Sequence, residues 1–265
     1  MLDDLLGGLK RLFAREDDEQ RVPSSPLATG SAEGRALVYR GPAASPGCPE
    51  AVAGVLRDCG LDVEYVGPHE RVQLDDEALA SARVYAQPGG DDMDDTWEYM
   101  SPHKKQIKNF VKGGGVYLGF CLGGYLAGQG PGFRLLPGDT DQYIVSEGAT
   151  VSHEGNTVVT VDWRGSRRDL FFQDGPYFAV DDVDGLDIIA RYDNGLPAAL
   201  IVPVGSGVLG VTGPHPEATR DWFTDCGLRV PRPSGIDLAK DLVLTALARQ
   251  THVPGGPGVP GAVRP

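Results

Sequence analysis

Hydrophobic positions near the N-terminus of this chain recur at helical spacing. The repeating apolar residues are Leu2, Leu5, Leu6, Leu9 and Phe13. This spacing predicts an amphipathic helix over residues 2–16, and we assign residues 1–18 to it. We expect the helix to dock on its own domain or on a partner protein, because Asp3 and Asp4 at its start disfavour a membrane surface.

The pattern then changes to short apolar runs that alternate with amphipathic stretches. The predicted strands are "RALVYR", "LDVEYVG", "ARVYAQ" and "VYLGF", and the predicted helices are "CPEAVAGVLRDC", which ends at Gly60, and "SPHKKQIKNFVKGGG". Strands that alternate with helices at these lengths form a parallel sheet. We therefore expect an α/β domain with a mostly parallel sheet and helices on both faces.

The hydrophobic pattern changes again between residues 142 and 193. Short apolar runs separated by turn residues predict an inserted antiparallel β region there. A β-hairpin, "AALIVPVGSGVLGVTG", and a late helix, "IDLAKDLVLTALARQ", complete the domain, which we place at residues 34–250. Pro, Ser and Gly make residues 19–33 a predicted linker, and the Pro/Gly-rich residues 251–265 a predicted disordered tail.

Composition narrows the function classes. The chain has 265 residues and a net charge of -13, which disfavours binding to nucleic acid or to an acidic membrane. The four cysteines have neither zinc nor disulfide-framework spacing, so we expect them to be reduced. We find no signal peptide and no apolar run long enough to span a membrane, so we expect a cytoplasmic protein.

The strongest candidate for chemistry is Cys121, in "GGGVYLGFCLGGYLAG". Gly119 and Gly123 stand two residues before and after Cys121. In the G-x-S-x-G motif, glycines at the same spacing flank a nucleophilic serine on a sharp strand-to-helix turn. Glycine is suited to such a turn because it has no Cβ atom to crowd the backbone. We therefore predict Cys121 as a nucleophile; a packed, inert cysteine is the alternative.

A cysteine nucleophile needs a base and an oxyanion hole. In "GPHPE", His215 is the predicted base and Glu217 the residue that orients its ring. His153, which Glu154 follows, is a second candidate base. The predicted oxyanion donors are the backbone N–H groups of Leu122 and, in "QPGGDD", Gly90.

Metal and cofactor chemistry have little support in the sequence. The acidic stretch "DDMDDTWE" lacks the spacing of a calcium loop, and we expect it to be a solvated loop. There is no phosphate-binding glycine motif, since "GGGVYLG" precedes a strand rather than opening a helix. We therefore predict neither a metal nor a cofactor.

The motifs "VYLGFCLGGYLAG" and "HPE" resemble the class I glutamine amidotransferase-like superfamily, whose fold is flavodoxin-like. With "LVYRGPAASPGCPEAV", "YAQPGGDD" and "DGPYF", the chain is more narrowly similar to the N-terminal domain of eukaryotic-type biotin-protein ligases. The resemblance covers roughly residues 35 to 225 and implies the same roles for Cys121, His215 and Glu217. It includes neither a biotin-ligase catalytic domain nor a G-R-G-R-type loop, so we expect no biotinylation by this chain alone.

The sequence departs from the superfamily's motif at one position that contributes to substrate binding. Glutamine-using members have C-x-G-x-Q, and here Tyr125 takes the place of the Gln, which points away from glutamine. We assign Gly89 and Tyr125 to substrate binding. The sequence thus predicts a cysteine hydrolase or amidotransferase-type enzyme that cleaves an amide or ester of a small molecule through a thioester. The alternatives are a non-catalytic regulatory or ligand-binding module on the same scaffold, and a redox sensor.

Overall fold

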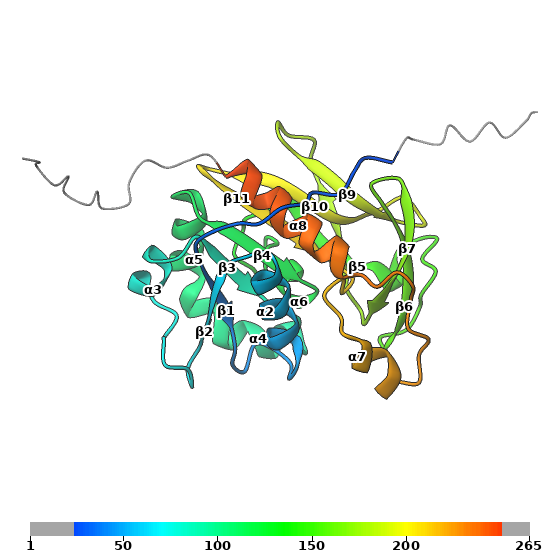
Figure 1. Ribbon diagram of the computed structural model, residues 1–265, viewed down its shortest axis with the longest axis horizontal. Helices are drawn as coiled ribbons and strands as arrows, with labels where there is room; N and C mark the ends of the chain where they lie inside the picture. Colours follow the sequence, from blue (N-terminus) through cyan, green and yellow to red (C-terminus); the bar gives the residue numbers. More distant parts are fainter. Residues whose placement is uncertain (1–23, 251–265) are drawn as a thin grey trace, which may run out of the picture.

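The computed structural model describes residues 24–250 and builds them around one nine-stranded sheet (Figure 1). The strand order is β2-β1-β3-β4-β11-β10-β9-β6-β7. Its parallel half consists of β1 (Arg35–Tyr39), β2 (Asp62–Val66), β3 (Val84–Gln87), β4 (Val116–Phe120) and β11 (Gly207–Thr212). Every residue of β3, β4 and β11 is buried, as expected of parallel strands that are covered on both faces.

The other half of the sheet is antiparallel and continues from β11 without a break. It consists of β10 (Pro197–Val204), β9 (Asp187–Tyr192), β6 (Thr157–Trp163) and β7 (Ser166–Phe172). A separate two-stranded sheet pairs β5 (Gly138–Gln142) with β8 (Pro176–Val180). The predicted hairpin is therefore present as β10 and β11, whereas most of the region expected as an insertion extends the main sheet.

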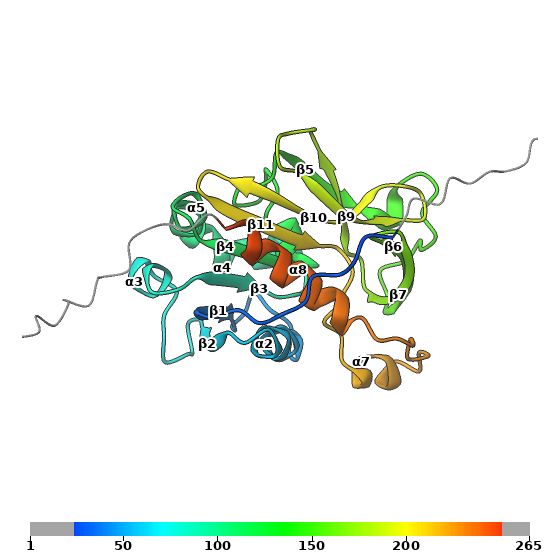
Figure 2. The same cartoon turned by 45° about the horizontal axis from the view of Figure 1, so that its top comes forward.

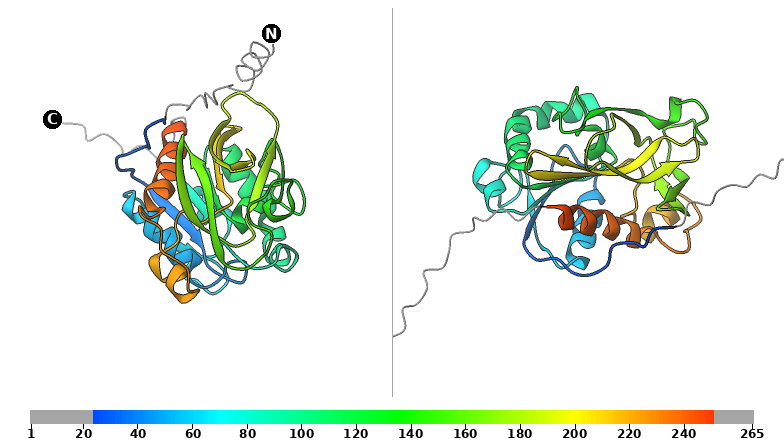
Figure 3. Two further views of the ribbon diagram at one scale, coloured as in Figure 1. Left: turned by 90° about the vertical axis from the view of Figure 1, so that its right-hand side faces the viewer. Right: turned by 90° about the horizontal axis from the view of Figure 1, so that it is seen from above.

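Helices cover both faces of the sheet. They are α2 (Cys48–Asp58), α3 (Asp76–Ala80), α4 (Met93–Met100), α5 (Lys104–Lys112), α6 (Leu122–Tyr125), α7 (Arg220–Asp225) and α8 (Ile236–Arg249), with short 3₁₀ turns η1 (Ser101–His103) and η2 (Tyr143–Val145). Figures 2 and 3 show α8 lying across one face and α5 on the opposite one. The side chains of β1 alternate accordingly: Ala36 and Val38 pack into the core with α2 and α8, and Leu37 into the core with α3 and α5.

The predicted helices "CPEAVAGVLRDC" and "IDLAKDLVLTALARQ" are confirmed as α2 and α8. Gly60, just beyond α2, has φ 92, the left-handed conformation that favours glycine after a helix. The solvated loop predicted at "DDMDDTWE" is wrong. Residues from Met93 onward form α4, because the Asp92 carboxylate caps the helix and accepts a hydrogen bond from the N–H of Asp94 at 2.8 Å.

The predicted N-terminal helix, residues 1–18, and the predicted tail, residues 251–265, lie outside the described residues. Of the predicted linker, residues 24–33 are described, and they run along α8 (Figure 1, dark blue). In the part of the chain that the structure describes, no helix has the length and apolar character to cross a membrane.

Candidate functional site

Cys121 stands at a sharp turn between β4 and α6, with φ 50 and ψ -105, which L-residues rarely adopt. The two framing glycines are required by contact. A Cβ on Gly119 would lie 2.3 Å from the carbonyl oxygen of Gly123, and a Cβ on Gly123 would lie 2.1 Å from that of Gln87. Both clashes are with backbone, which cannot swing away. The G-x-C-x-G frame therefore makes the tight turn predicted from it.

His215 and Glu217 lie in the loop after β11, beside this turn. His215 Nδ1 and Glu217 Oε1 are 2.8 Å apart, and both side chains are almost completely buried. Burial by itself lowers the pKa of His215, but the Glu217 carboxylate and the Cys121 sulfur outweigh it and raise the pKa to about 10. The structure therefore brings Cys121, His215 and Glu217 together, and the Glu217 carboxylate favours the charged form of the imidazole.

Gly89 and Gly90 follow β3 and bring its end close to the Cys121 turn. A Cβ on Gly90 would lie 2.3 Å from Leu122 Cδ2, so the two predicted oxyanion donors belong to adjacent backbone segments. A Cβ on Gly89 would lie 2.7 Å from His215 Cε1 and 3.3 Å from Cys48 Sγ. Gly89 thus packs behind the imidazole, and Cys48 is a buried neighbour that sequence patterns did not single out.

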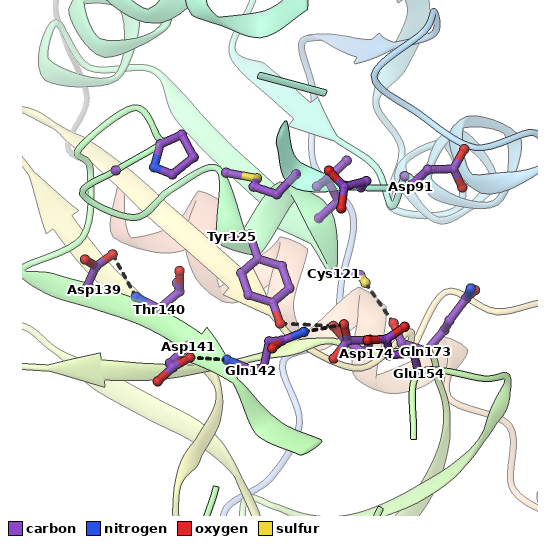
Figure 4. Close-up of a pocket in the computed structure, with 16 residues that line it drawn as sticks. Asp91, Cys121, Tyr125, Asp139, Thr140, Asp141, Gln142, Glu154, Gln173 and Asp174 are labelled. Carbon is purple, nitrogen blue, oxygen red and sulfur yellow. Dashed lines mark hydrogen bonds between the residues drawn. The ribbon is translucent and has the colours of Figure 1, made fainter. Parts of the chain in front are cut away.

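Cys121, Gly90, Leu122 and Tyr125 line a cavity of about 550 Å³ (Figure 4). Six acidic residues also line it, namely Asp91, Asp92, Asp139, Asp141, Glu154 and Asp174. No Lys or Arg is among the described residues that line this cavity. Its volume lies in the range of small-molecule sites, which is roughly 300–1,000 Å³.

Asp174, which lines the cavity, is held by hydrogen bonds from two other lining residues. Its backbone oxygen accepts a hydrogen bond from the Tyr125 hydroxyl at 3.1 Å, and its Oδ2 accepts one from Gln142 Nε2 at 2.8 Å. Its Oδ1 is shielded from solvent and has no hydrogen-bond partner among the described residues. Burial raises the pKa of this carboxyl, the Gln142 hydrogen bond lowers it, and Glu154 raises it further, with a net increase. Sequence reasoning missed Asp174 as a site residue, although "DGPYF" was a visible motif.

His153 and the other three cysteines do not line the cavity. His153 is exposed, and its Nδ1 accepts a hydrogen bond from the N–H of Gly155 at 3.2 Å, whereas the adjacent Glu154 lines the cavity. Cys226 is exposed and Cys59 is buried elsewhere, in the core with α2 and α8. Among residues 24–250, no group of three or more His, Cys, Asp or Glu side chains is arranged to hold a metal ion.

Sequence comparison relates part of this chain to biotin-protein ligases. Residues 35–149 match the family model "Biotin-protein ligase, N terminal". A biotin–protein ligase from Schizosaccharomyces pombe is 28% identical over 215 residues, covering 68% of this chain and 33% of that protein. The predicted resemblance is therefore confirmed, and the chain spans about a third of the length of this curated relative.

Two solved structures, both of cytoplasmic proteins from Salmonella typhimurium, are also similar to this chain. One has 13% identity and a TM-score of 0.47, covering 80% of this chain and 98% of its own. The other has 12% identity and a TM-score of 0.48, covering 82% and 99%.

The predicted function, a cysteine hydrolase or amidotransferase-type enzyme working through a thioester, is wrong. The sequence matches point instead to the N-terminal domain of a biotin-protein ligase, and the curated relative is a ligase rather than a hydrolase. The physical reason for the error is that a scaffold can bring Cys, His and Glu side chains together without defining a reaction. In this structure the Cys121 thiol donates a hydrogen bond to the carbonyl of Gln173, at 3.5 Å.

Proposed function

We propose that this chain is a ligand-binding domain of the kind found at the N-terminus of biotin-protein ligases. Its cavity at Cys121 would bind a small molecule without making or breaking covalent bonds. The observation that carries the proposal is the cavity of about 550 Å³, whose walls come from separate segments around the carboxyl ends of parallel strands. Ligands of open α/β sheets bind at this edge.

The site residues take binding and positioning roles in this proposal. Cys121, Gly90 and Leu122 line the cavity, and the Tyr125 hydroxyl holds the loop that carries Asp174 through a hydrogen bond to its backbone oxygen. Gly89 leaves room for His215, and the buried His215–Glu217 pair supports the Cys121 turn from behind. A buried charged pair of this kind favours one local arrangement of the backbone over others.

The relation to a ligase is inferred from the curated relative. Because that protein is a biotin–protein ligase and this chain spans about a third of it, we infer that the domain serves a ligase reaction carried out by another polypeptide or segment. Residues 1–18 are the proposed docking element for such a partner, and a cytoplasmic location is part of the same proposal. We also assign the parallel half, in the order β2-β1-β3-β4-β11, to the flavodoxin-like scaffold of the class I glutamine amidotransferase-like superfamily.

A fragment screen by NMR tests the binding function. ¹⁵N-labelled full-length protein is titrated with cationic, neutral and anionic fragments, biotin included. We expect at least one fragment to shift the amide signals of the cavity segments around Gly90, Tyr125 and Asp174.

Two matched variants locate the binding. Thr140→Trp fills the cavity, since Thr140 lines it, and should abolish these shifts. Thr224→Trp adds the same side chain at an exposed position of α7 and should leave them unchanged. Fragments that bind equally to both variants, or that bind only outside the cavity, would contradict the proposal.

A further inference from the structure

Asp174 gives the cavity a preference for one chemical class of ligand. We infer that the site binds a positively charged nitrogen, such as a primary ammonium group, and that the Asp174 carboxylate is the group that receives it. This inference rests on the proposed binding function and deepens it by naming the ligand class.

The Asp174 carboxylate is held in place through one of its two oxygens, while the other oxygen makes no hydrogen bond within residues 24–250. Gln142 Nε2 holds Oδ2 at 2.8 Å, and the Tyr125 hydroxyl holds the backbone oxygen of Asp174 at 3.1 Å. Oδ1 is shielded from solvent and has no hydrogen-bond partner within residues 24–250, in a residue that lines the cavity. Leaving a shielded carboxylate oxygen unpaired is unfavourable, so a small shift of the Asp174 side chain that brings Oδ1 to a ligand N–H group in the cavity would relieve a cost that the free protein carries.

The backbone at Asp174 supports the same conclusion. Asp174 has φ 46, a left-handed conformation in which aspartate and asparagine are tolerated better than most residues. This conformation lies directly before Gly175, whose Cβ would clash with the carbonyl of Gly213 at 2.1 Å. The loop is therefore tightly packed, and no Lys, Arg or His of residues 24–250 forms an ion pair with the Asp174 carboxylate.

The remaining charges of the cavity select for a cation. Asp91, Asp92, Asp139, Asp141 and Glu154 line the same space, and among the described lining residues there is no Lys or Arg. A cavity with one sign of charge raises the local concentration of the opposite ion. The carboxylate of biotin and the phosphates of a nucleotide therefore do not fit this lining, whereas an ammonium group does.

Two sources could supply an ammonium group: a free small amine or a lysine side chain presented by a protein. The experiment starts with three probes of similar size, n-butylamine, n-butanol and butyrate, added to ¹⁵N-labelled full-length protein at pH about 7, where the amine is charged. We expect only the amine to shift the amide signals of Tyr125, Gln142 and Asp174. Equal shifts with butanol or butyrate would overturn the inference.

Variants test the role of Asp174. Asp174→Asn keeps the shape and tolerates the left-handed backbone, and should weaken n-butylamine binding by about ten-fold or more. Asp225→Asn, in the exposed end of α7, should change it by less than about two-fold. If Asp174→Asn does not fold, Asp141→Asn removes a second lining charge and should still weaken binding, by about three-fold. Unchanged affinity in the folded variants would overturn the inference.

A peptide separates the two sources. If acetyl-Gly-Lys-Gly-amide binds more tightly than n-butylamine and its Nε-acetylated form does not bind, the ligand is a lysine side chain. If n-butylamine binds more tightly than the peptide, the ligand is a free amine. Either order supports an ammonium site. If the cavity binds only neutral or anionic fragments, this inference fails while the proposed binding function stands, and if it binds no fragment, both fail.

Discussion

At the scale of single residues, Gly123 determines whether the Cys121 turn can form. Its missing side chain lets α6 start directly against β3, because a Cβ there would lie 2.1 Å from the carbonyl oxygen of Gln87. Gly123→Ala should therefore lower the free energy of unfolding by about 2 kcal/mol or more, since neither backbone can move without opening the sheet edge. Urea denaturation measures the change.

A second glycine serves as the control. Gly54 is exposed within α2, and a Cβ there would meet nothing within 4 Å. Gly54→Ala should leave stability unchanged or raise it by about 0.5–1 kcal/mol, because alanine favours a helix. Equal effects of the two substitutions would show that the Gly123 contact is not responsible.

The charge of His215 is a second residue-scale property. The Glu217 carboxylate contributes to raising the pKa of His215 to about 10. Because the folded-state pKa lies above the unfolded value of about 6.5, the stabilisation from this pair is complete below pH about 6.5 and is lost as the pH rises through about 10. Glu217→Gln should lower the pKa of His215 and remove much of this pH dependence.

An NMR titration of the His215 ring checks this prediction. In the wild-type protein we expect the ring to remain protonated at pH about 8, and in Glu217→Gln to lose its proton at a lower pH than in the wild type. A wild-type His215 that titrates below its ordinary value of about 6.5 would contradict it.

Residue patterns predicted part of this site. The glycine frame around Cys121 and the spacing of His215 and Glu217 were visible because each depends on residues close together in the sequence. Asp174 was not, because its role depends on Gln142 and on the cavity, which distant segments create. Nor could the frame around Cys121 predict the reaction, because a tight turn serves binding as well as catalysis.

At the scale of elements, one buried carboxylate of α8 links this helix to the β6–β7 hairpin and to the segment of residues 24–33. Asp241 is completely buried and accepts hydrogen bonds from Trp163 Nε1 at 2.8 Å, from Arg164 Nε at 2.8 Å and from the N–H of Ala28 at 2.7 Å. Asp241→Ala should cost about 3–5 kcal/mol, because it leaves the buried Trp163 N–H without its acceptor and removes the closest carboxylate partner of Arg164, whose side chain is only 14% exposed.

Asp237 on the same helix provides the matched control. It pairs with Arg168, but its side chain is 45% exposed. Asp237→Ala should cost less than about 1 kcal/mol. Urea denaturation measures the free energy of unfolding of both variants. Similar decreases in the two variants would mean that burial of the ion pair does not affect stability.

Sequence periodicity identified α2, α8 and the parallel strands because each has a strong local pattern. It did not identify α4, whose acidic residues look like a solvated loop until the cap formed by Asp92 is seen. Nor did it predict that β9 joins the main sheet, since that pairing with β10 is a contact between strands and leaves no signal within either one.

At the scale of the whole molecule, residues 24–33 lie against the domain rather than apart from it. The N–H of Ser25 donates to the carbonyl of Arg164 at 3.0 Å, and that of Ala32 donates to the carbonyl of Cys59 at 2.6 Å. The N–H of Ala28 also reaches Asp241. This segment therefore connects α8, the β6–β7 hairpin and the end of α2.

Two truncations test whether the stable domain starts at residue 34 or earlier. Removing residues 1–33 should lower the unfolding temperature by roughly 5 °C or more relative to removing residues 1–23, because it leaves part of the α8 contact unpaired. Thermal unfolding followed by circular dichroism measures the difference. Equal unfolding temperatures would support the domain boundary predicted at residue 34.

The most direct test of binding without covalent chemistry is a titration of wild-type protein and Cys121→Ser with the tightest cavity fragment, followed by NMR. Serine preserves the shape of the turn but is a far weaker nucleophile than cysteine. We predict dissociation constants that agree within about three-fold, because the cavity walls and Asp174 are unchanged. A loss of binding in Cys121→Ser of about a hundred-fold or more would contradict the central claim and would mean that the sulfur itself reacts with the ligand.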